Sequence, residues 1–164
     1  MPFVLELLRH GEALPAGAAG DGARRLSAAG RRAIEQLAAT LAAEGWRPDR
    51  VFTSPLLRAR DSTRIVLEPL VPALEPEVLD ELATAPAPEV MVELLGELGV
   101  NDGRVLLVGH QPLMGRLVHY LEGERERDMP TGAFVRFECP QGLRAGGCRV
   151  SWHVRAGRAS GNSS

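Results

Sequence analysis

The sequence predicts an α/β protein, a three-layer α/β/α sandwich whose mainly parallel central sheet has antiparallel edge strands. Three observations predict this class. Short apolar runs alternate with segments of helical periodicity over residues 3–121. Two segments in which apolar and polar residues alternate follow at 133–139 and 148–154. The chain has 164 residues, a length typical of one domain.

The first expected strand is the apolar run at 3–8, and an alanine- and glycine-rich, mobile loop is expected at 13–26. Ser27 is a favourable N-cap for a helix that extends to about Glu44. Its side-chain oxygen can accept a hydrogen bond from a free amide of the first helical turn. Gly45 is expected to end this helix.

A second strand is expected at 50–53. Ser54 and Pro55 then predict a helix to about Leu67, with serine as the N-cap and proline at the first helical position. Three prolines between residues 69 and 76 favour an extended segment after this helix.

The second half of the chain continues the alternation. A helix is expected at 88–98, a fully buried strand at 104–108 and a further helix at 112–121. The tail at 156–164 is small and polar and is predicted to be disordered. A single domain is therefore expected over residues 1–155.

The composition excludes several classes of protein. The formal charge of −2 argues against a general nucleic-acid binder. No apolar run approaches the roughly 18 residues of a membrane span, and no basic region precedes the short apolar N-terminal stretch. Two cysteines provide neither a disulfide scaffold nor a zinc set. We expect a cytoplasmic monomer that binds neither membrane nor nucleic acid.

Residues with phosphate-binding chemistry follow the carboxyl ends of three expected strands. Arg9 and His10 follow the first strand, Ser54 and Arg58 follow the second, and His110 follows the strand at 104–108. In parallel sheets the ligand binds beyond these strand ends, so we expect the five residues to share one rim. All 19 basic residues other than histidine are arginines, so position and not residue type selects Arg9 and Arg58.

Two expected helices also begin at this rim, one after Ser54 and one after Gln111. A helix N-terminus presents free N–H groups and partial positive charge. Together with two arginines and two histidines, these N-termini predict a site for a doubly charged tetrahedral oxyanion, that is, a phosphoryl group.

Several motifs at these positions carry a family resemblance. They are LRHGEA at 8–13, Arg24 with Leu26, Ser27 and Gly30, SPLLRA at 54–59, VGHQP at 108–112 and PTGA at 130–133. The sequence resembles the histidine phosphatase superfamily, which has the phosphoglycerate mutase-like fold. It is most similar to the short SixA-type phosphohistidine phosphatases. Ser62 stands where the family usually has threonine.

The resemblance implies that His10 is a nucleophile that carries a transient phosphoryl group. Attack requires a neutral imidazole, and the adjacent positive charges of Arg9 and Arg58 disfavour its protonation. Arg9, Arg58 and His110 are expected to hold the phosphoryl oxygens, with no metal ion or other cofactor. The substrate-binding residues implied in this way are Arg9, Gly11, Arg24, Ser54, Arg58, His110 and Gln111.

A leaving group that is not labile needs a proton from an acidic side chain. In this superfamily an acidic residue beyond the middle of the chain commonly serves. Glu81 is the candidate, and Asp80 and Glu12 are the alternatives.

The expected substrate is phosphohistidine on a signalling or phosphotransfer protein, such as a histidine-phosphotransfer domain or a phosphotransfer carrier. Only about a dozen irregular residues separate Leu74 from the helix at Pro88, which leaves little chain for a lid over the rim. A small-molecule phosphomonoesterase on the same scaffold is the alternative enzyme. A non-catalytic phosphate- or phosphohistidine-binding module is the alternative outside enzymes, and the presence of His10 beside both arginines disfavours it.

Overall fold

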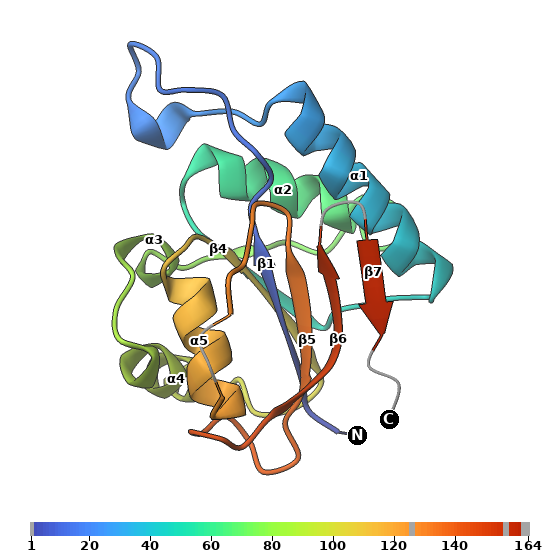
Figure 1. The fold of residues 1–164 in the computed structure, drawn as a ribbon, viewed down its shortest axis with the longest axis vertical. Helices are drawn as coiled ribbons and strands as arrows, with labels where there is room; N and C mark the ends of the chain where they lie inside the picture. Colours follow the sequence, from blue (N-terminus) through green and yellow to red (C-terminus); the bar gives the residue numbers. More distant parts are fainter. Residues whose placement is uncertain (1, 125–126, 156–157, 162–164) are drawn as a thin grey trace.

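A computed structural model describes residues 2–124, 127–155 and 158–161 and has the predicted α/β architecture (Figure 1). The strands are β1 (Val4–Arg9), β2 (Arg50–Thr53), β3 (Glu77–Val78), β4 (Arg104–Gly109), β5 (Phe134–Glu138), β6 (Arg149–Arg155) and β7 (Arg158–Gly161). The helices are η1 (Asp21–Ala23), α1 (Ala28–Ala43), α2 (Leu57–Leu67), α3 (Glu81–Thr84), α4 (Pro88–Glu97) and α5 (Leu113–Glu122).

The strands form one sheet in the order β3-β2-β4-β1-β5-β6-β7. Strands β3, β2, β4 and β1 are parallel to one another, whereas β5 pairs antiparallel with β1 and β6, and β7 pairs antiparallel with β6. Helices α1 and α2 cover one face of the sheet, and α4 and α5 cover the other (Figure 1). The predicted fold class, including the antiparallel strands at one edge, is therefore confirmed.

The central strands are mostly apolar because both of their faces are buried. In β1, Leu5 and Leu7 pack into the core beneath α4 and α5, whereas Leu8 packs beneath α1 and α2. In β4, Leu107 packs beneath α4 and α5, and Leu106 packs beneath α1 and α2. This two-sided burial is typical of parallel sheets covered by helices.

Glu6, at the middle of β1, is fully buried and lies in a network of charged side chains beneath α1. Its carboxylate accepts hydrogen bonds from Trp46 Nε1 at 2.7 Å, Arg104 Nη1 at 2.5 Å and Arg136 Nε at 2.7 Å. Arg136 also forms an ion pair with Glu44. A buried carboxylate is tolerated here because two guanidinium groups and an indole satisfy it.

The structure departs from the sequence prediction at the start of α2. This helix begins at Leu57, with Leu56 at the N-cap position, and not at Pro55. The predicted N-cap Ser54 precedes the helix, although its Oγ still accepts a hydrogen bond from Leu56 N at 3.2 Å. Ser54 continues the β2 pairing, because its amide donates to Val108 O at 3.0 Å, and this extension delays the helix.

The structure also differs at the end of the chain, where a disordered tail was expected from residue 156. Residues 158–161 form β7, which pairs with the outer edge of β6. Backbone hydrogen bonds to a free strand edge need no apolar side chains, so small polar residues can form this strand. Residues 156–157 and 162–164 lie outside the described residues. Strand β3 and the short elements α3 and η1 were not predicted.

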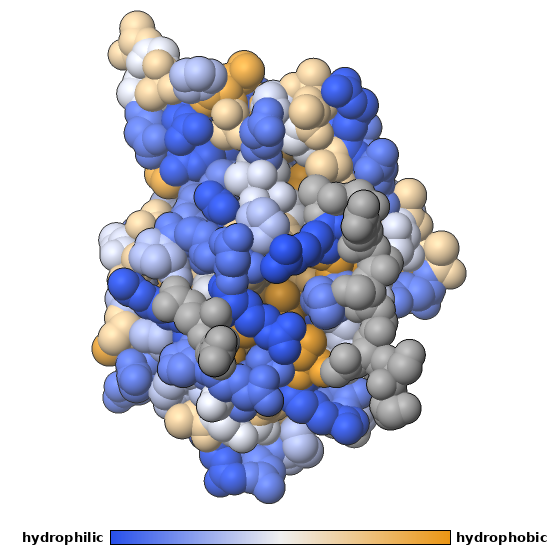
Figure 2. Space-filling model, in the orientation of Figure 1, coloured by the Kyte–Doolittle hydropathy of each residue, from blue (hydrophilic) through white to orange (hydrophobic). Residues whose placement is uncertain are grey.

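No helix in the described part of the chain is long and apolar enough to cross a membrane. The face shown in Figure 2 is largely hydrophilic, with small apolar patches between polar side chains.

Candidate active site

The sheet register brings three predicted site residues to one rim. Strands β1 and β4 pair Arg9 with Gly109, so the residues that follow them, His10 and His110, leave the sheet side by side. The His10 amide donates to Gly109 O at 3.1 Å. The centroids of the two imidazole rings are 4.9 Å apart, and the rings are tilted by 52°. Ser54 reaches the same rim from the end of β2.

The hydrogen bonds of His10 decide which of its ring nitrogens is free to react. Its Nδ1 lies 2.7 Å from Gly11 O, and a carbonyl oxygen can only accept a hydrogen bond. The proton of the neutral ring therefore lies on Nδ1, and Nε2 keeps its lone pair. His10 is only 6% exposed, so this orientation is fixed by packing as well as by the hydrogen bond.

Gly11 serves this geometry with both of its backbone groups. Its carbonyl holds His10, and its amide donates to Ser62 Oγ at 3.0 Å. Ser62 Oγ in turn donates to Arg58 O at 2.8 Å. In this structure the Gly11 N–H is occupied by Ser62 and its carbonyl positions His10, and the predicted substrate-binding role of Gly11 stays a prediction.

Gly30 lets this segment approach α1. A Cβ atom at Gly30 would lie 2.1 Å from Glu12 O, so a larger residue would displace the chain just after His10.

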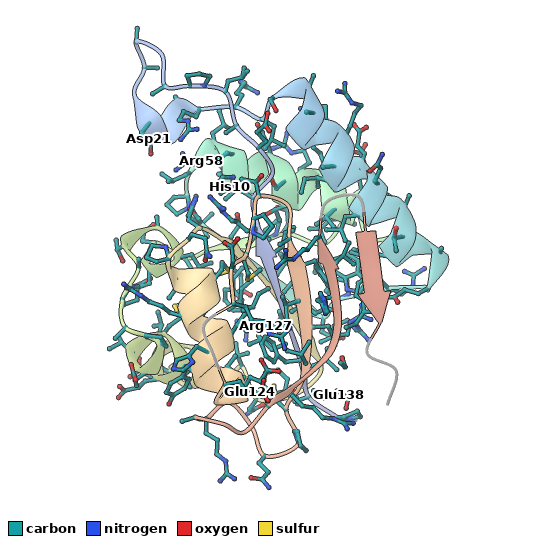
Figure 3. All side chains as sticks on the ribbon, viewed as in Figure 1. His10, Asp21, Arg58, Glu124, Arg127 and Glu138 are labelled. Carbon is teal, nitrogen blue, oxygen red and sulfur yellow. The ribbon has the colours of Figure 1, made fainter. Side chains whose placement is uncertain are left out.

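Of the two arginines predicted to bind phosphate, Arg58 lies beside His10 (Figure 3), and the positive charge of Arg9 also acts on the His10 imidazole. Arg58 donates from Nη1 to Asp21 O at 3.0 Å and from Nη2 to Asp21 Oδ2 at 3.2 Å. Arg9 donates from Nη1 to Met129 O at 3.0 Å. These contacts orient both guanidinium groups while leaving other N–H groups available.

Three buried nitrogen atoms at the rim have no hydrogen-bond partner among the described residues. They are Arg9 Nε, Arg58 Nε and His110 Nδ1. Buried polar groups in folded proteins are almost always hydrogen-bonded, so three orphans at one site indicate a missing partner. An oxyanion supplies the acceptor oxygens that the two arginine N–H groups lack, and it can accept from His110 Nδ1 when that atom carries the ring proton.

The environment keeps both imidazoles neutral. Burial, followed by the positive charges of Arg58, Arg9 and Arg24, lowers the pKa of His10 to about 4 against the hydrogen bond to Gly11. Burial also lowers the pKa of His110 to about 4, helped by His10, Arg58 and Arg9 and opposed by Asp21. The expectation that His10 is neutral near pH 7 agrees with these values, although burial is a larger cause than the two arginines named from the sequence.

These pKa values predict how the protein responds to acid. Both imidazoles should stay neutral until the pH approaches 4, whereas an unfolded chain takes up these protons near pH 6.5. Because the unfolded state then binds more protons, the free energy of unfolding should fall as the pH drops from about 6.5 to 4. Nitrogen-15 NMR titration of the imidazoles checks this, and a midpoint near 6.5 for His10 would contradict it.

The remaining predicted binding residues mostly contact other protein groups. Ser54 Oγ lies 2.6 Å from His110 Nε2, and Gln111 Oε1 accepts a hydrogen bond from Gly115 N at 2.7 Å at the start of α5. Arg24 donates to Leu14 O at 2.7 Å and to Asp21 Oδ1 at 3.2 Å. The positive charge of Arg24 also acts on His10, because it helps to lower the pKa of that imidazole.

The candidate acids differ in how they are held. Glu81 begins α3, which packs against the end of β4, and among the described residues its side chain forms no hydrogen bond or ion pair. Glu12 Oε1 instead accepts a hydrogen bond from Ser27 Oγ at 2.9 Å at the start of α1. Asp80 occupies the N-cap position of α3 without a side-chain capping bond. Glu81 therefore remains the candidate acid, and its role stays a prediction.

Sequence reasoning missed two residues that organise the rim. Asp21, in the loop expected to be mobile, binds both Arg24 and Arg58. Ser62 holds the Gly11 amide. Asp21 is the one acidic residue of the stretch 13–26, and this is the signal that could have drawn attention to it.

The geometry agrees with comparisons to known proteins. Residues 5–85 match the model of the histidine phosphatase superfamily (branch 1). The fold is similar to that of the protein histidine phosphatase SixA complexed with tungstate, with a TM-score of 0.81 and 28% identity over 94% of this chain and 97% of that chain. The chain belongs to the histidine phosphatase superfamily.

Other solved structures share the fold of this histidine phosphatase. One is a protein from Agrobacterium tumefaciens that is described as a candidate phosphohistidine phosphatase SixA. Its TM-score is 0.77 at 23% identity, over 94% of this chain and 99% of that chain. The α-ribazole phosphatase from Shigella flexneri has a TM-score of 0.67 at 20% identity over 87% of this chain and 95% of that chain. No curated protein matches the sequence. These findings support a phosphatase.

Arginine and imidazole nitrogens dominate the rim of this histidine phosphatase. Among the described residues, no group of three or more His, Cys, Asp or Glu side chains is arranged to hold a metal ion.

Proposed function

We propose that this histidine phosphatase hydrolyses phosphohistidine on a protein, through a phosphohistidine intermediate on His10. One observation carries the proposal: the Nε2 lone pair of His10 lies at a rim where two buried arginine N–H groups lack an acceptor and the buried Nδ1 of His110 has no partner among the described residues. A pure binding site needs the donors but not the lone pair. The combination suits transfer of a phosphoryl group to a nitrogen.

The transfer proceeds in two displacements. In the first, the His10 Nε2 lone pair attacks phosphorus, and the bond from phosphorus to the substrate nitrogen breaks with its electron pair on that nitrogen, which takes up a proton. In the second, the oxygen of a water molecule attacks phosphorus and releases its proton. The bond to His10 Nε2 then breaks, and the lone pair returns to the ring as phosphate leaves.

The donors at the rim stabilise the charge on the transferred group. Arg9, Arg58 and His110 offer N–H groups to its oxygens, and burial strengthens each of these interactions. Because Asp21 and Met129 already orient the guanidinium groups, little rearrangement is needed during transfer.

A protein substrate is favoured by the short chain around the rim. Between α2 and α4, residues 68–87 form only the two-residue strand β3, the one-turn helix α3 and loops. The cavity of about 430 Å³ beside α2 has no lining residue among Arg9, His10, Arg58 and His110. An open rim of this kind accepts a phosphohistidine that projects from a phosphotransfer domain or carrier of a signalling system.

A small-molecule phosphomonoesterase is the second candidate. It is favoured by the similarity of the fold to solved structures of an α-ribazole phosphatase and a phosphoserine phosphatase, with TM-scores of 0.67 for both at 20% and 12% identity.

A substrate panel separates the candidates. The protein is incubated without added metal, and with a chelator, with a phosphohistidine-bearing carrier domain and separately with small phosphate esters. We expect kcat/KM for the carrier to exceed that for every ester. Turnover of esters alone would overturn the proposed substrate, and tight phosphate binding without any turnover would identify a binding module.

Replacing Arg58 with lysine should lower kcat/KM by about 10- to 100-fold although the charge is kept. Lysine has no planar fork with which to bind Asp21 and the phosphoryl oxygens together. Arg60→Lys, two residues further along α2 on an exposed position, is the matched control and should retain full activity. Equal activity of both variants in a steady-state assay would show that charge alone is required.

A further inference from the structure

We propose that Ser54 is a positioning residue that fixes the tautomer of His110, so that His110 presents an N–H and not a lone pair to the phosphoryl group. Ser54 was expected from the sequence to bind substrate directly. The structure places its hydroxyl 2.6 Å from His110 Nε2.

The partners of the Ser54 hydroxyl determine which atom donates in its hydrogen bond to His110 Nε2. Its oxygen already accepts a hydrogen bond from Leu56 N at 3.2 Å, and the residue is fully buried. Apart from His110 Nε2, no described residue accepts the hydroxyl proton of Ser54. If Nε2 carried the ring proton, the hydroxyl would have two donors and no acceptor, an unsatisfied buried group that costs about 1–3 kcal/mol.

The hydroxyl of Ser54 therefore donates to His110 Nε2. The proton of the neutral His110 ring must then lie on Nδ1, since the hydrogen bond made by one ring nitrogen sets the state of the other. Nδ1 is the atom of His110 that is buried and has no acceptor among the described residues. Ser54 thus gives the uncharged His110 ring an N–H at the buried atom that has no partner among the described residues.

The two histidines consequently have the same tautomer but opposite functions. In His10, the Gly11 carbonyl holds the proton on Nδ1 and leaves a lone pair on Nε2 for attack. In His110, Ser54 occupies Nε2 and leaves a proton on Nδ1 for a phosphoryl oxygen. Since both rings are neutral, they can lie 4.9 Å apart without charge repulsion.

The sheet and helix α2 hold the Ser54 hydroxyl in place beside His110. Its amide extends the pairing between β2 and β4 through Val108 O, and its side chain accepts the Leu56 N–H at the start of α2. The hydroxyl is thereby held by the sheet and the helix, on the element next to the strand that carries His110.

Imidazole nitrogen-15 NMR of the wild-type protein at pH 7 tests the tautomer directly. We expect the His110 signals of a neutral ring with the proton on Nδ1, and in Ser54→Ala a shift toward the form with the proton on Nε2. Ser54→Thr keeps the hydroxyl and should restore the wild-type pattern. A wild-type ring with its proton on Nε2, or an unchanged tautomer in Ser54→Ala, would overturn the proposal, and the wild-type spectrum decides even if the alanine variant does not fold.

Kinetics test the consequence, which rests on the proposed function. Ser54→Ala should lower kcat about 10- to 100-fold with a smaller change in KM. This is less than the roughly 100- to 1000-fold cost of removing an oxyanion donor outright, because the variant keeps the His110 ring. Thr63→Val is the matched control, because Thr63 is a buried hydroxyl on α2 that bonds to Thr53 and not to His110. It should leave both kcat and the His110 tautomer unchanged. A tautomer change with no effect on kcat would overturn the catalytic role of the His110 N–H and leave the proposed substrate intact. If the wild type shows no turnover, the proposed function alone is overturned.

Discussion

Replacing His10 with alanine is expected to abolish the phosphoenzyme and to lower turnover on the order of 10⁴-fold or more, as loss of a nucleophile does in other enzymes. The Nε2 atom of His10 is the nitrogen at the rim with both a free lone pair and adjacent donors. Rapid-quench measurements with a phosphate-labelled carrier domain follow the intermediate, and steady-state phosphate release follows turnover.

His119→Ala is the control for this variant. His119 lies on α5, contacts the backbone of Glu124 and does not belong to the rim. It should form the phosphoenzyme at the wild-type rate. Undiminished labelling of His10→Ala would refute the assignment of the nucleophile. Transfer to His110 would not explain such labelling, because Ser54 occupies its Nε2 and its Nδ1 carries a proton.

Replacing Glu6 with alanine is expected to lower the free energy of unfolding by about 3–5 kcal/mol, the cost of breaking a buried ion pair from one side. The change leaves the guanidinium of Arg136 and the indole N–H of Trp46 without their buried acceptor. Arg136 keeps its contact with Glu44, but that carboxylate lies nearer the surface. Urea denaturation monitored by circular dichroism measures the change.

Glu138→Ala provides the matched comparison for Glu6→Ala. Glu138 forms an ion pair with Arg149, whose side chain is 76% exposed. Exposed pairs contribute about 0–1 kcal/mol, so this variant should be nearly as stable as the wild type. If both variants lose the same free energy of unfolding, the buried ion pairs of Glu6 contribute no more to stability than an exposed pair.

The rim was predictable from the sequence because it depends on signals that are local. The largely apolar runs in β1 and β4 indicate strands buried on both faces, and parallel strands align their carboxyl ends. It follows that Arg9, His10 and His110 meet, and the register of β1 with β4 places them so. The alternation of residues in β5 and β6 likewise indicated the antiparallel side of the sheet.

The contacts behind the rim were not predictable, because they join residues far apart in the chain. The hydrogen bond between Ser54 and His110 spans 56 positions, and the one between Arg58 and Asp21 spans 37. Ser54 carried a strong local signal for an N-cap, and pairing with β4 overrode it. Glu6 gave no signal of its ion network, since its partners Arg104 and Arg136 come from two other strands.

The most direct test of a covalent mechanism on His10 is to locate the phosphoryl group in the trapped intermediate. The enzyme is quenched during turnover under conditions that preserve phosphohistidine, digested, and examined by mass spectrometry and NMR. The structure predicts a phosphoryl group on Nε2 of His10, because Nδ1 is held by Gly11 O. A phosphoryl group on Nδ1, on another residue, or on no residue while turnover proceeds would contradict the mechanism.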